Sequence, residues 1–188
     1  MLYAKLKYWS NLLKTSLRLS SLFLLTALLL TACGYHNPYI YTGPEKSIYV
    51  THWKNKTNAL QLDTKIYQSL THWFQKSNSI KVTNGKAGAD LILAGEVLSI
   101  QLPSLSYGIG NTASSVKVIL TVRYILKDIK TGEVLLEVPG EIWSEDSRTT
   151  QSATATTDNE DRALATIIDN LSEKIYIKAL DRLSALKG

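Results

Sequence analysis

Two segments of the chain repeat apolar residues at the spacing of an amphipathic helix. The first carries five of them: Leu62, Ile66, Leu70, Trp73 and Phe74. Asn58 and Gln61 form a capping-box pattern just before it. This pattern predicts a helix over residues 58–76, with the aromatic pair at its end packed in the core.

The second helical stripe lies at the C-terminus. Thr157 and Glu160 form another capping-box pattern. The apolar residues that follow are Leu164, Ile167, Ile168, Leu171, Ile175, Ala179, Leu180 and Leu183. We therefore expect a long helix over residues 158–184, packed on a sheet through this stripe.

Alternating or continuous apolar runs predict the strands. Residues 47–53, 80–83 and 89–102 are rich in β-branched and aliphatic side chains, and the third run is apolar on both faces. A strand from residue 116 to 127 alternates cleanly. Its apolar set is Val116, Val118, Leu120, Val122, Tyr124 and Leu126, and its polar set is Lys117, Thr121, Arg123 and Lys127. One face of this strand should pack in the core, and the other, the wet face, should be exposed to solvent.

Asp128 to Gly132 reads as a hairpin turn, after which Val134, Leu136 and Val138 return on the core face. If Lys127 lies opposite Glu133, the same register places Arg123 opposite Glu137. Residues 103–115 are expected to form a loop, since they combine Pro103 with several Gly and Ser. Residues 144–157, eight of which are Ser or Thr, are expected to form a second one.

The order of these elements predicts an α+β fold. We expect a single, mostly antiparallel or mixed sheet of four to five strands, with two helices packed on one face. The other face is then left to solvent or to a partner.

The N-terminus has the build of a secretory signal peptide. Four basic residues precede an uncharged apolar run, which ends in Leu30-Thr31-Ala32-Cys33, a pattern similar to a bacterial lipobox. The run is too short for a typical membrane-spanning helix. We therefore expect removal of residues 1–32 and lipid attachment at Cys33. A lipidated tether over residues 33–45 and one domain over residues 46–186 would follow.

The leader also explains the basic charge of the chain. It holds four of the 21 Lys and Arg and none of the 16 Asp and Glu, so the processed chain has 17 basic and 16 acidic residues. Nucleic-acid binding usually requires a concentrated basic face, and the balance disfavours it.

Catalytic and metal-binding patterns are not found in the sequence. The histidines His36, His52 and His72 lack metal-ligand spacing. The sequence contains no nucleophile elbow, phosphate loop or dinucleotide fingerprint. Among the acidic residues, Glu96, Glu141, Glu145 and Asp146 offer no spacing that pairs two carboxylates. We expect no enzyme activity, no cofactor and no metal.

Four motifs in order resemble the LPS-assembly lipoprotein family LptE. They are Cys33-Gly34-Tyr35-His36, Trp53-Lys54-Asn55-Lys56-Thr57, Ala89-Asp90 opening a strand that ends near Pro103 and Tyr107, and Lys130-Thr131-Gly132-Glu133-Val134-Leu135. Each motif is common alone, whereas their order and spacing are more specific. Trp53 stands where the family pattern leads us to expect Phe.

The resemblance implies an outer-membrane lipoprotein on the periplasmic side. It would sit as a plug in the LptD β-barrel, help that barrel to fold, and aid delivery of lipopolysaccharide to the cell surface. Gly34, rather than Asp, after the acylated cysteine is similar to what sorts such proteins to the outer membrane. Its partners would be LptD, lipopolysaccharide and the outer-membrane lipid around Cys33.

Strand parity gives candidate contact residues. Lys117, Arg123 and Lys127 on the wet face are candidates for lipopolysaccharide binding, with exposed ion pairs as the alternative. The two polar loops are expected to contact the barrel through Tyr107, Asn111, Thr150 and Thr154. Plain surface loops are the alternative.

Two other functions fit a lipidated α+β domain. One is a lipoprotein that activates a peptidoglycan synthase, and the other is a binding module for a small envelope ligand. Only about ten residues separate Cys33 from the first strand, an extended reach of roughly 35 Å. This short reach favours a barrel partner, whereas an enclosed apolar pocket would favour the small-ligand module.

Overall fold

The structure, a computed structural model, describes residues 40, 41, 43–102, 104–107, 113–148 and 153–186. The expected leader and Cys33 lie outside these residues. Along the chain run β1 (Lys46–Val50), β2 (Lys54–Asn55), α2 (Leu62–Gln75), β3 (Ile80–Thr83), β4 (Leu91–Gln101), β5 (Ser104–Tyr107), β6 (Ala113–Asp128), β7 (Val134–Arg148) and α3 (Ala153–Ala185).

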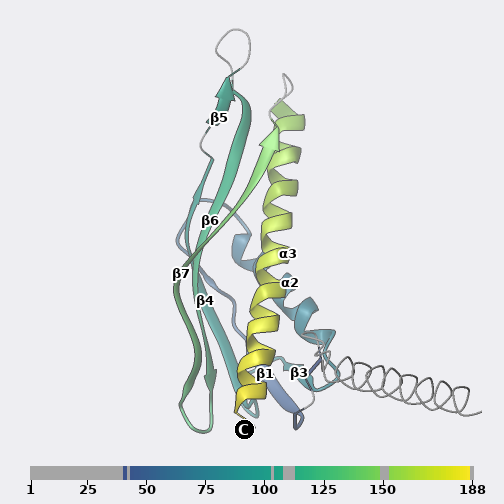
Figure 1. Cartoon of the computed structure of the whole chain (residues 1–188). Helices are drawn as coiled ribbons and strands as arrows, with labels where there is room; N and C mark the ends of the chain where they lie inside the picture. Colours follow the sequence, from purple (N-terminus) through teal and green to yellow (C-terminus); the bar gives the residue numbers. More distant parts are fainter. Residues whose placement is uncertain (1–39, 42, 103, 108–112, 149–152, 187–188) are drawn as a thin grey trace, which may run out of the picture. The chain divides into compact units, whose positions relative to one another are not determined.

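The strands form one mixed sheet built around β6 (Figure 1). β1 lies between β3 and β4 and is parallel to both, because α2 carries the chain back between β1 and β3. β4 and β5 pair antiparallel with β6 on one side, and β7 pairs antiparallel with it on the other. In the described chain the sheet has seven strands, because the short β2 and β5 add to those expected.

Both helices cover the same face of the sheet, which confirms the α+β class. Leu62, Ile66, Leu70 and Phe74 of α2 are fully buried, as their spacing of four predicts. They share one core with the buried side chains of β6 and with the α3 stripe. A fully buried aliphatic or aromatic side chain contributes about 1.5–3 kcal/mol. Because the core includes residues of α3 from Ala163 to Leu183, it follows most of this helix, which runs beside β6 and β7 (Figure 1).

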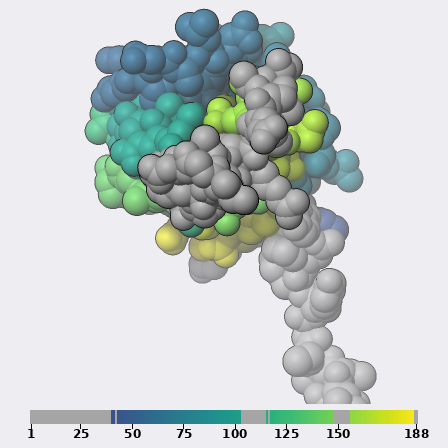
Figure 2. Space-filling model, turned by 90° about the horizontal axis from the view of Figure 1, so that it is seen from above, coloured from purple at the N-terminus to yellow at the C-terminus, as the bar shows by residue number. Residues whose placement is uncertain are grey.

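The two helices are parallel neighbours. Lys65 pairs with Asp161 at 3.3 Å, and Trp73 Nε1 donates to Asp169 at 2.8 Å, so eight residues along α2 match eight along α3. Viewed from above, the blue residues of the first half of the chain lie along one side of the domain, beside the teal and green residues of the longer strands (Figure 2).

Both predicted helix starts are wrong. Helix α2 begins at Leu62 after Gln61, whose φ of 61° is left-handed, and no side chain caps it. The side chain of Asn55 instead organises the preceding turn. It accepts from the backbone N–H of Thr57 and donates to the carbonyl of Ala59. At the C-terminus, α3 begins at Ala153, so Thr157 lies inside the helix.

Most of the two predicted loops is regular structure. Ser104–Tyr107 forms β5 and pairs with the beginning of β6. Residues 144–148 continue β7 opposite residues 115–119. The composition of Ser and small residues suggested loops, but a sixteen-residue neighbour strand supplies partners for their backbone groups. Residues 103, 108–112 and 149–152 of the expected loops lie outside the described residues.

The predicted register of the β6–β7 hairpin is also wrong. Lys127 lies opposite Val134, and Glu137 lies opposite Ile125. Asp128 N–H donates to the carbonyl of Glu133, so Glu133 pairs with Asp128 and not with Lys127. Leu135 is then an extra residue in β7, and Val134 is 46% exposed instead of joining the core with Leu136.

A second irregularity lies in the middle of β7. Tyr124 pairs with Val138, and Val122 pairs with Glu141. Two residues of β7, Pro139 and Gly140, therefore lie opposite one residue of β6, Arg123. This is a β-bulge, and it reverses which residues of β7 face the helices. Proline has no backbone N–H to donate, and it is tolerated at this position because a bulge on an edge strand requires no hydrogen bond from it.

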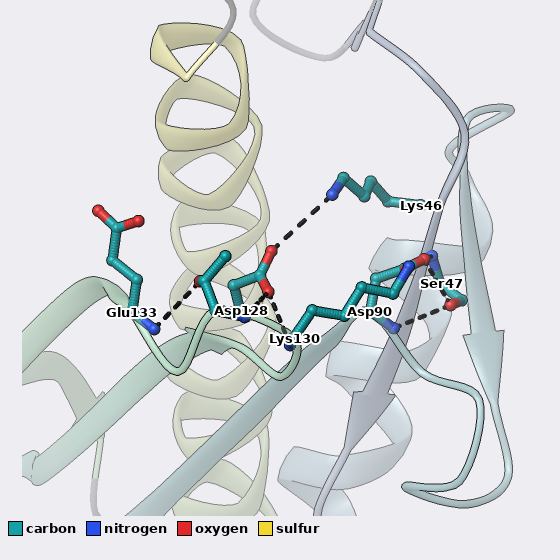
Figure 3. Close-up of polar contacts among 7 residues, drawn as sticks. Lys46, Ser47, Asp90, Asp128, Lys130 and Glu133 are labelled. Carbon is teal, nitrogen blue, oxygen red and sulfur yellow. Dashed lines mark hydrogen bonds and ion pairs between the residues drawn. The ribbon is translucent and has the colours of Figure 1, made fainter.

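Polar contacts hold the tip of the β6–β7 hairpin against β1 and β4, a cluster that we call the hairpin anchor (Figure 3). Asp90 accepts from the backbone N–H and the hydroxyl of Ser47, at 2.9 and 2.8 Å, and from Lys130 Nζ at 2.6 Å. Asp128 accepts from the backbone N–H groups of Lys130 and Thr131 and lies 3.9 Å from Lys46 Nζ.

The anchor lowers the pKa values of its carboxyl groups. The hydrogen bond from Lys130, followed by those from Ser47, holds the pKa of Asp90 far below its usual range. Backbone hydrogen bonds from Thr131 and Lys130 lower the pKa of Asp128, although burial opposes them. A carboxylate with a lowered pKa stabilises the fold above its unfolded pKa and loses this contribution as the pH falls.

The Trp53 ring packs closely against β4 at Gly95. A Cβ atom on Gly95 would lie 2.6 Å from the indole of Trp53. Trp53 is 2% exposed and stacks on Tyr124 with ring centroids 6.0 Å apart. The ring therefore has little room to move away.

We predict that Gly95→Ala lowers the free energy of unfolding by about 1–3 kcal/mol, because a buried methyl group is forced into a packed ring. Gly140→Ala is the matched control, since an added Cβ there meets nothing within 4 Å. Urea unfolding of both variants measures the difference. Equal stabilities would show that Trp53 can shift without cost.

We predict that Asp90→Asn costs about 1.5–3 kcal/mol at pH 7, the range for hydrogen bonds to a charged group. The natural chain should lose stability as the pH falls below about 4, where carboxylates of unfolded chains protonate. The variant should lose less over the same range. Unfolding free energies at pH 7 and pH 3 test this, with the exposed Asp158→Asn as control. A loss of unfolding free energy from pH 7 to pH 3 that is as large in Asp90→Asn as in the natural chain would contradict this prediction.

Candidate functional site

The polar face of β6 points away from the helices, as its alternation predicts, and we call this side of the sheet the outer face. Lys117, Arg123 and Lys127 all lie on it, between the buried residues of the core face. Ile119 and Ile125, both partly buried, separate them. The outer face is therefore mixed in character rather than uniformly polar.

Arg123 is held by an acidic residue of the neighbouring strand. Its Nε donates to Glu96 at 2.9 Å, and its terminal nitrogen lies 2.6 Å from the same oxygen. Lys56 Nζ also contacts that oxygen at 2.6 Å. The hydrogen bond from Lys56, and then the one from Arg123, lower the pKa of Glu96. One carboxylate thus serves two cations, which leaves a net positive charge.

The other two predicted cations differ in their partners. Lys117 lies 3.7 Å from Asp146 on β7, in a loose exposed ion pair. Lys127 has no ion-pair partner within the part of the chain that the structure describes. At about 3.4 Å per residue, six residues place Lys117 roughly 20 Å from Arg123, and four place Lys127 roughly 14 Å away. The three cations therefore form a row, not a pocket for a single phosphate.

A groove of about 410 Å³ crosses the strands at Arg123, and we call it the outer groove. Its lining comes from four separated parts of the chain: His52, Lys54, Ala94, Gly95, Glu96, Arg123, Tyr124, Ile125, Glu137, Val138 and Pro139. The groove is deep at Ala94 and Gly95 because these residues have little or no side chain. The bulge at Pro139 forms one of its borders. Such a volume is within the range of small-molecule sites.

Sequence reasoning found only Arg123 of this groove. Lys54 belongs to a two-residue strand, and Glu137 was expected to pair with Arg123. The one available signal was Ala94-Gly95 inside an otherwise aliphatic strand, because glycine in a strand often marks a close approach.

Glu141, one of the carboxylates considered for catalysis, belongs to a polar cluster on the helix face. Glu141 lies on the helix face of β7, where it contacts Lys174 at 2.7 Å and Lys178 at 3.3 Å. The hydroxyl of Tyr124 donates to it at 2.8 Å. Burial raises the pKa of Glu141, but hydrogen bonds from Lys174 and Tyr124 outweigh this effect and lower it. This cluster joins the edge strand to α3.

Burial, and then the bond to Glu141, raise the pKa of Tyr124. Its hydroxyl is therefore a hydrogen-bond donor at neutral pH. Within the described ranges no group of His, Cys, Asp and Glu is arranged to hold a metal ion.

Two of the four predicted barrel contacts lie in described elements at one end of the sheet, and the side chains of all four are outside the description. Tyr107 ends β5, and Thr154 lies in the first turn of α3. Figure 1 shows β5 and the beginning of α3 at the same end of the sheet. Asn111 and Thr150, like Cys33, lie outside the described residues. Neither of the described helices is long and apolar enough to cross a membrane.

Solved structures share this fold. Lipoprotein B from Nitrosomonas europaea is 14% identical, with a TM-score of 0.55 over 81% of this chain and 94% of that one. The rare lipoprotein B from Shewanella oneidensis is 11% identical, with a TM-score of 0.53 over 76% of this chain and 99% of that one. At such identities the likeness shows the fold alone.

The sequence itself carries the assignment to a family. No curated protein matches the chain. The family model described as LptE, lipopolysaccharide-assembly, matches residues 45–179, which include every strand and most of α3. LptE proteins are lipoproteins without enzymatic activity. The chain therefore belongs to the LptE lipopolysaccharide-assembly family.

Proposed function

We propose that this protein is an outer-membrane lipoprotein, anchored through acylated Cys33, that plugs an LptD-type β-barrel and assists lipopolysaccharide delivery. The family match over residues 45–179 carries the proposal. It makes the chain a bacterial envelope lipoprotein of lipopolysaccharide assembly. The barrel, the outer membrane and the acyl chains are the further steps.

The arrangement of the domain supports a plug inserted by one end. The chain reaches β1 soon after Cys33, and Lys46 at the beginning of β1 lies with the hairpin anchor. β5 and the beginning of α3 lie at the opposite end of the sheet (Figure 1). The elements that carry Tyr107 and Thr154 thus lie at the end of the sheet opposite to the beginning of β1. Barrel lumens are water-lined, which suits the Ser and Thr of these segments.

The outer face supplies cations for lipopolysaccharide. The phosphates and acidic sugars of lipopolysaccharide are spread over a large molecule. A row of cations can therefore contact more of them than a single pocket can. Lys127 has no ion-pair partner in the described chain, and the pair of Lys117 is loose and exposed. We assign Lys117, Arg123 and Lys127 to this contact, with Lys127 the most available of the three.

Photo-crosslinkers at Tyr107, Asn111, Thr150 and Thr154 should trap a large β-barrel protein in outer membranes, as judged by mass spectrometry of the adduct. Ile66 and Ile167 are buried, so the exposed helix positions Gln68 and Asn170 are the better controls. Helix positions that trap the barrel while the loop positions stay silent would reverse the proposed geometry.

Changing Lys117, Arg123 and Lys127 together to Glu should weaken lipopolysaccharide binding about tenfold or more. Exposed charge contacts contribute about 0–1 kcal/mol each, and 1.4 kcal/mol is a factor of ten. The matched variant changes Lys65, Lys76 and Arg182, exposed cations of the helices, to Glu. Binding of labelled lipopolysaccharide to both folded variants is compared. Equal affinities would show that these three residues form only local ion pairs.

A further inference from the structure

The outer groove has one exposed charged side chain on each of its two outermost strands. Lys54 lies on β2 and Glu137 on β7, and both are exposed. Within the described residues neither makes an ion pair or a side-chain hydrogen bond. This sets them apart from Glu96 and Arg123 in the same groove, which already bind each other.

The separation of the two charges limits what can bridge them. β4 and β6 lie between β2 and β7, so three steps of about 4.8 Å across the sheet separate the two backbones. Lys54 is in register with Arg123, whereas Glu137 pairs with Ile125, two residues further along β6, so the two Cα atoms lie roughly 16 Å apart. An amino acid or an ethanolamine phosphate carries its two charges only a few bonds apart. An extended peptide advances about 3.3 Å per residue and covers this distance in four to five residues.

The walls of the groove suit such a peptide. Glu96 and Arg123, which bind each other, are in register with Lys54. Ala94, Gly95 and Ile125 form the apolar part of the floor, next to Glu137. The floor is rigid, because Trp53 packs under Gly95 and Glu96 fixes Arg123. A preformed surface lowers the ordering cost of binding.

Addition of a strand to the edge of β7 is a less suitable mode. The bulge at Pro139 and Gly140 interrupts that edge, and Glu133, Glu137 and Glu145 place negative charge along it. Bulges, proline and charge are the usual protections of an edge strand. A peptide in the groove instead lies across the strands on their outer face.

We propose that the outer groove binds an extended segment of a partner protein, four to five residues long. The segment carries an acidic side chain that pairs with Lys54 and a basic side chain that pairs with Glu137. Small aliphatic residues between them contact Ala94 and Gly95. Arg123 borders both this groove and the row of cations proposed for lipopolysaccharide, but the peptide contact uses Lys54 and Glu137 and does not depend on the lipopolysaccharide proposal.

Three dye-labelled peptides with blocked ends test the proposal: Asp-Ala-Val-Ala-Lys, Asp-Ala-Val-Ala-Asp and Lys-Ala-Val-Ala-Lys. Fluorescence anisotropy measures their binding to the full-length lipoprotein in detergent. The mixed peptide should bind about three- to fivefold more tightly than either of the others, as expected for one exposed ion pair of nearly 1 kcal/mol.

Charge exchange makes the test specific. Lys54→Glu should shift the preference to the basic peptide, Glu137→Lys should shift it to the acidic one, and the double variant should restore preference for the mixed peptide. Lys86→Glu, an exposed change outside the groove, should leave the order unchanged. Equal binding of the three peptides, or an order that the exchanges do not move, would overturn the proposal. Displacement of the mixed peptide by purified lipopolysaccharide would assign the groove to that lipid and overturn it as well.

Discussion

The pairing of β6 with three other strands is the constraint on which the rest of the structure depends. This strand alone joins β4 and β5 on one side to β7 on the other. Its core-face residues, from Val118 to Leu126, are buried against the helices. Its outer-face residues set the row of cations. A single alternation of side chains therefore decides both what the core contains and where a ligand can meet charge.

The bulge at Pro139 and Gly140 adapts β7 to both of its tasks. Before the bulge, Glu137 lies opposite Ile125 and faces outward into the groove. After it, Glu141 lies opposite the buried Val122 and reaches Lys174 on α3. Four residues along an unbroken strand would place both carboxylates on the same face. The extra residue lets one edge strand present charge to the outside and still be tied to the long helix.

The predictable part of the fold is the part set by local periodicity. The stripes of α2 and α3 and the alternation of β6 each repeat over several turns or residue pairs, so their buried residues could be named from the sequence. The helix starts could not be named, because Asn55 uses its side chain in a turn and Gln61 takes a left-handed conformation. The Ser and Thr segments were mistaken for loops because their strand pairing depends on distant residues.

The outer groove was beyond sequence reasoning for a related cause. Its lining residues come from β2, β4, β6 and β7, and two bulges in β7 shift the register that a simple hairpin implies. Arg123 was found because it follows the alternation of β6, but its partner is Glu96 on β4, not the expected Glu137. Strand order and bulges, which bring these residues together, are properties of the whole sheet.

The outer face combines paired and unpaired charges, and the two proposed contacts use them differently. A cation already held by a carboxylate contributes little further attraction, since exposed pairs are worth at most about 1 kcal/mol. Arg123 should therefore add less to either proposed contact than Lys54, Glu137 and Lys127, which have no ion-pair partner among the described residues. In the proposed peptide contact, the opposite signs of Lys54 and Glu137 would fix the direction of the bound segment. In the proposed lipopolysaccharide contact, Lys127 would attract anions without first breaking an ion pair. The two proposals thus require different charges of one face, so a change of Lys54 or Glu137 should affect the peptide contact and a change of Lys127 the lipid contact.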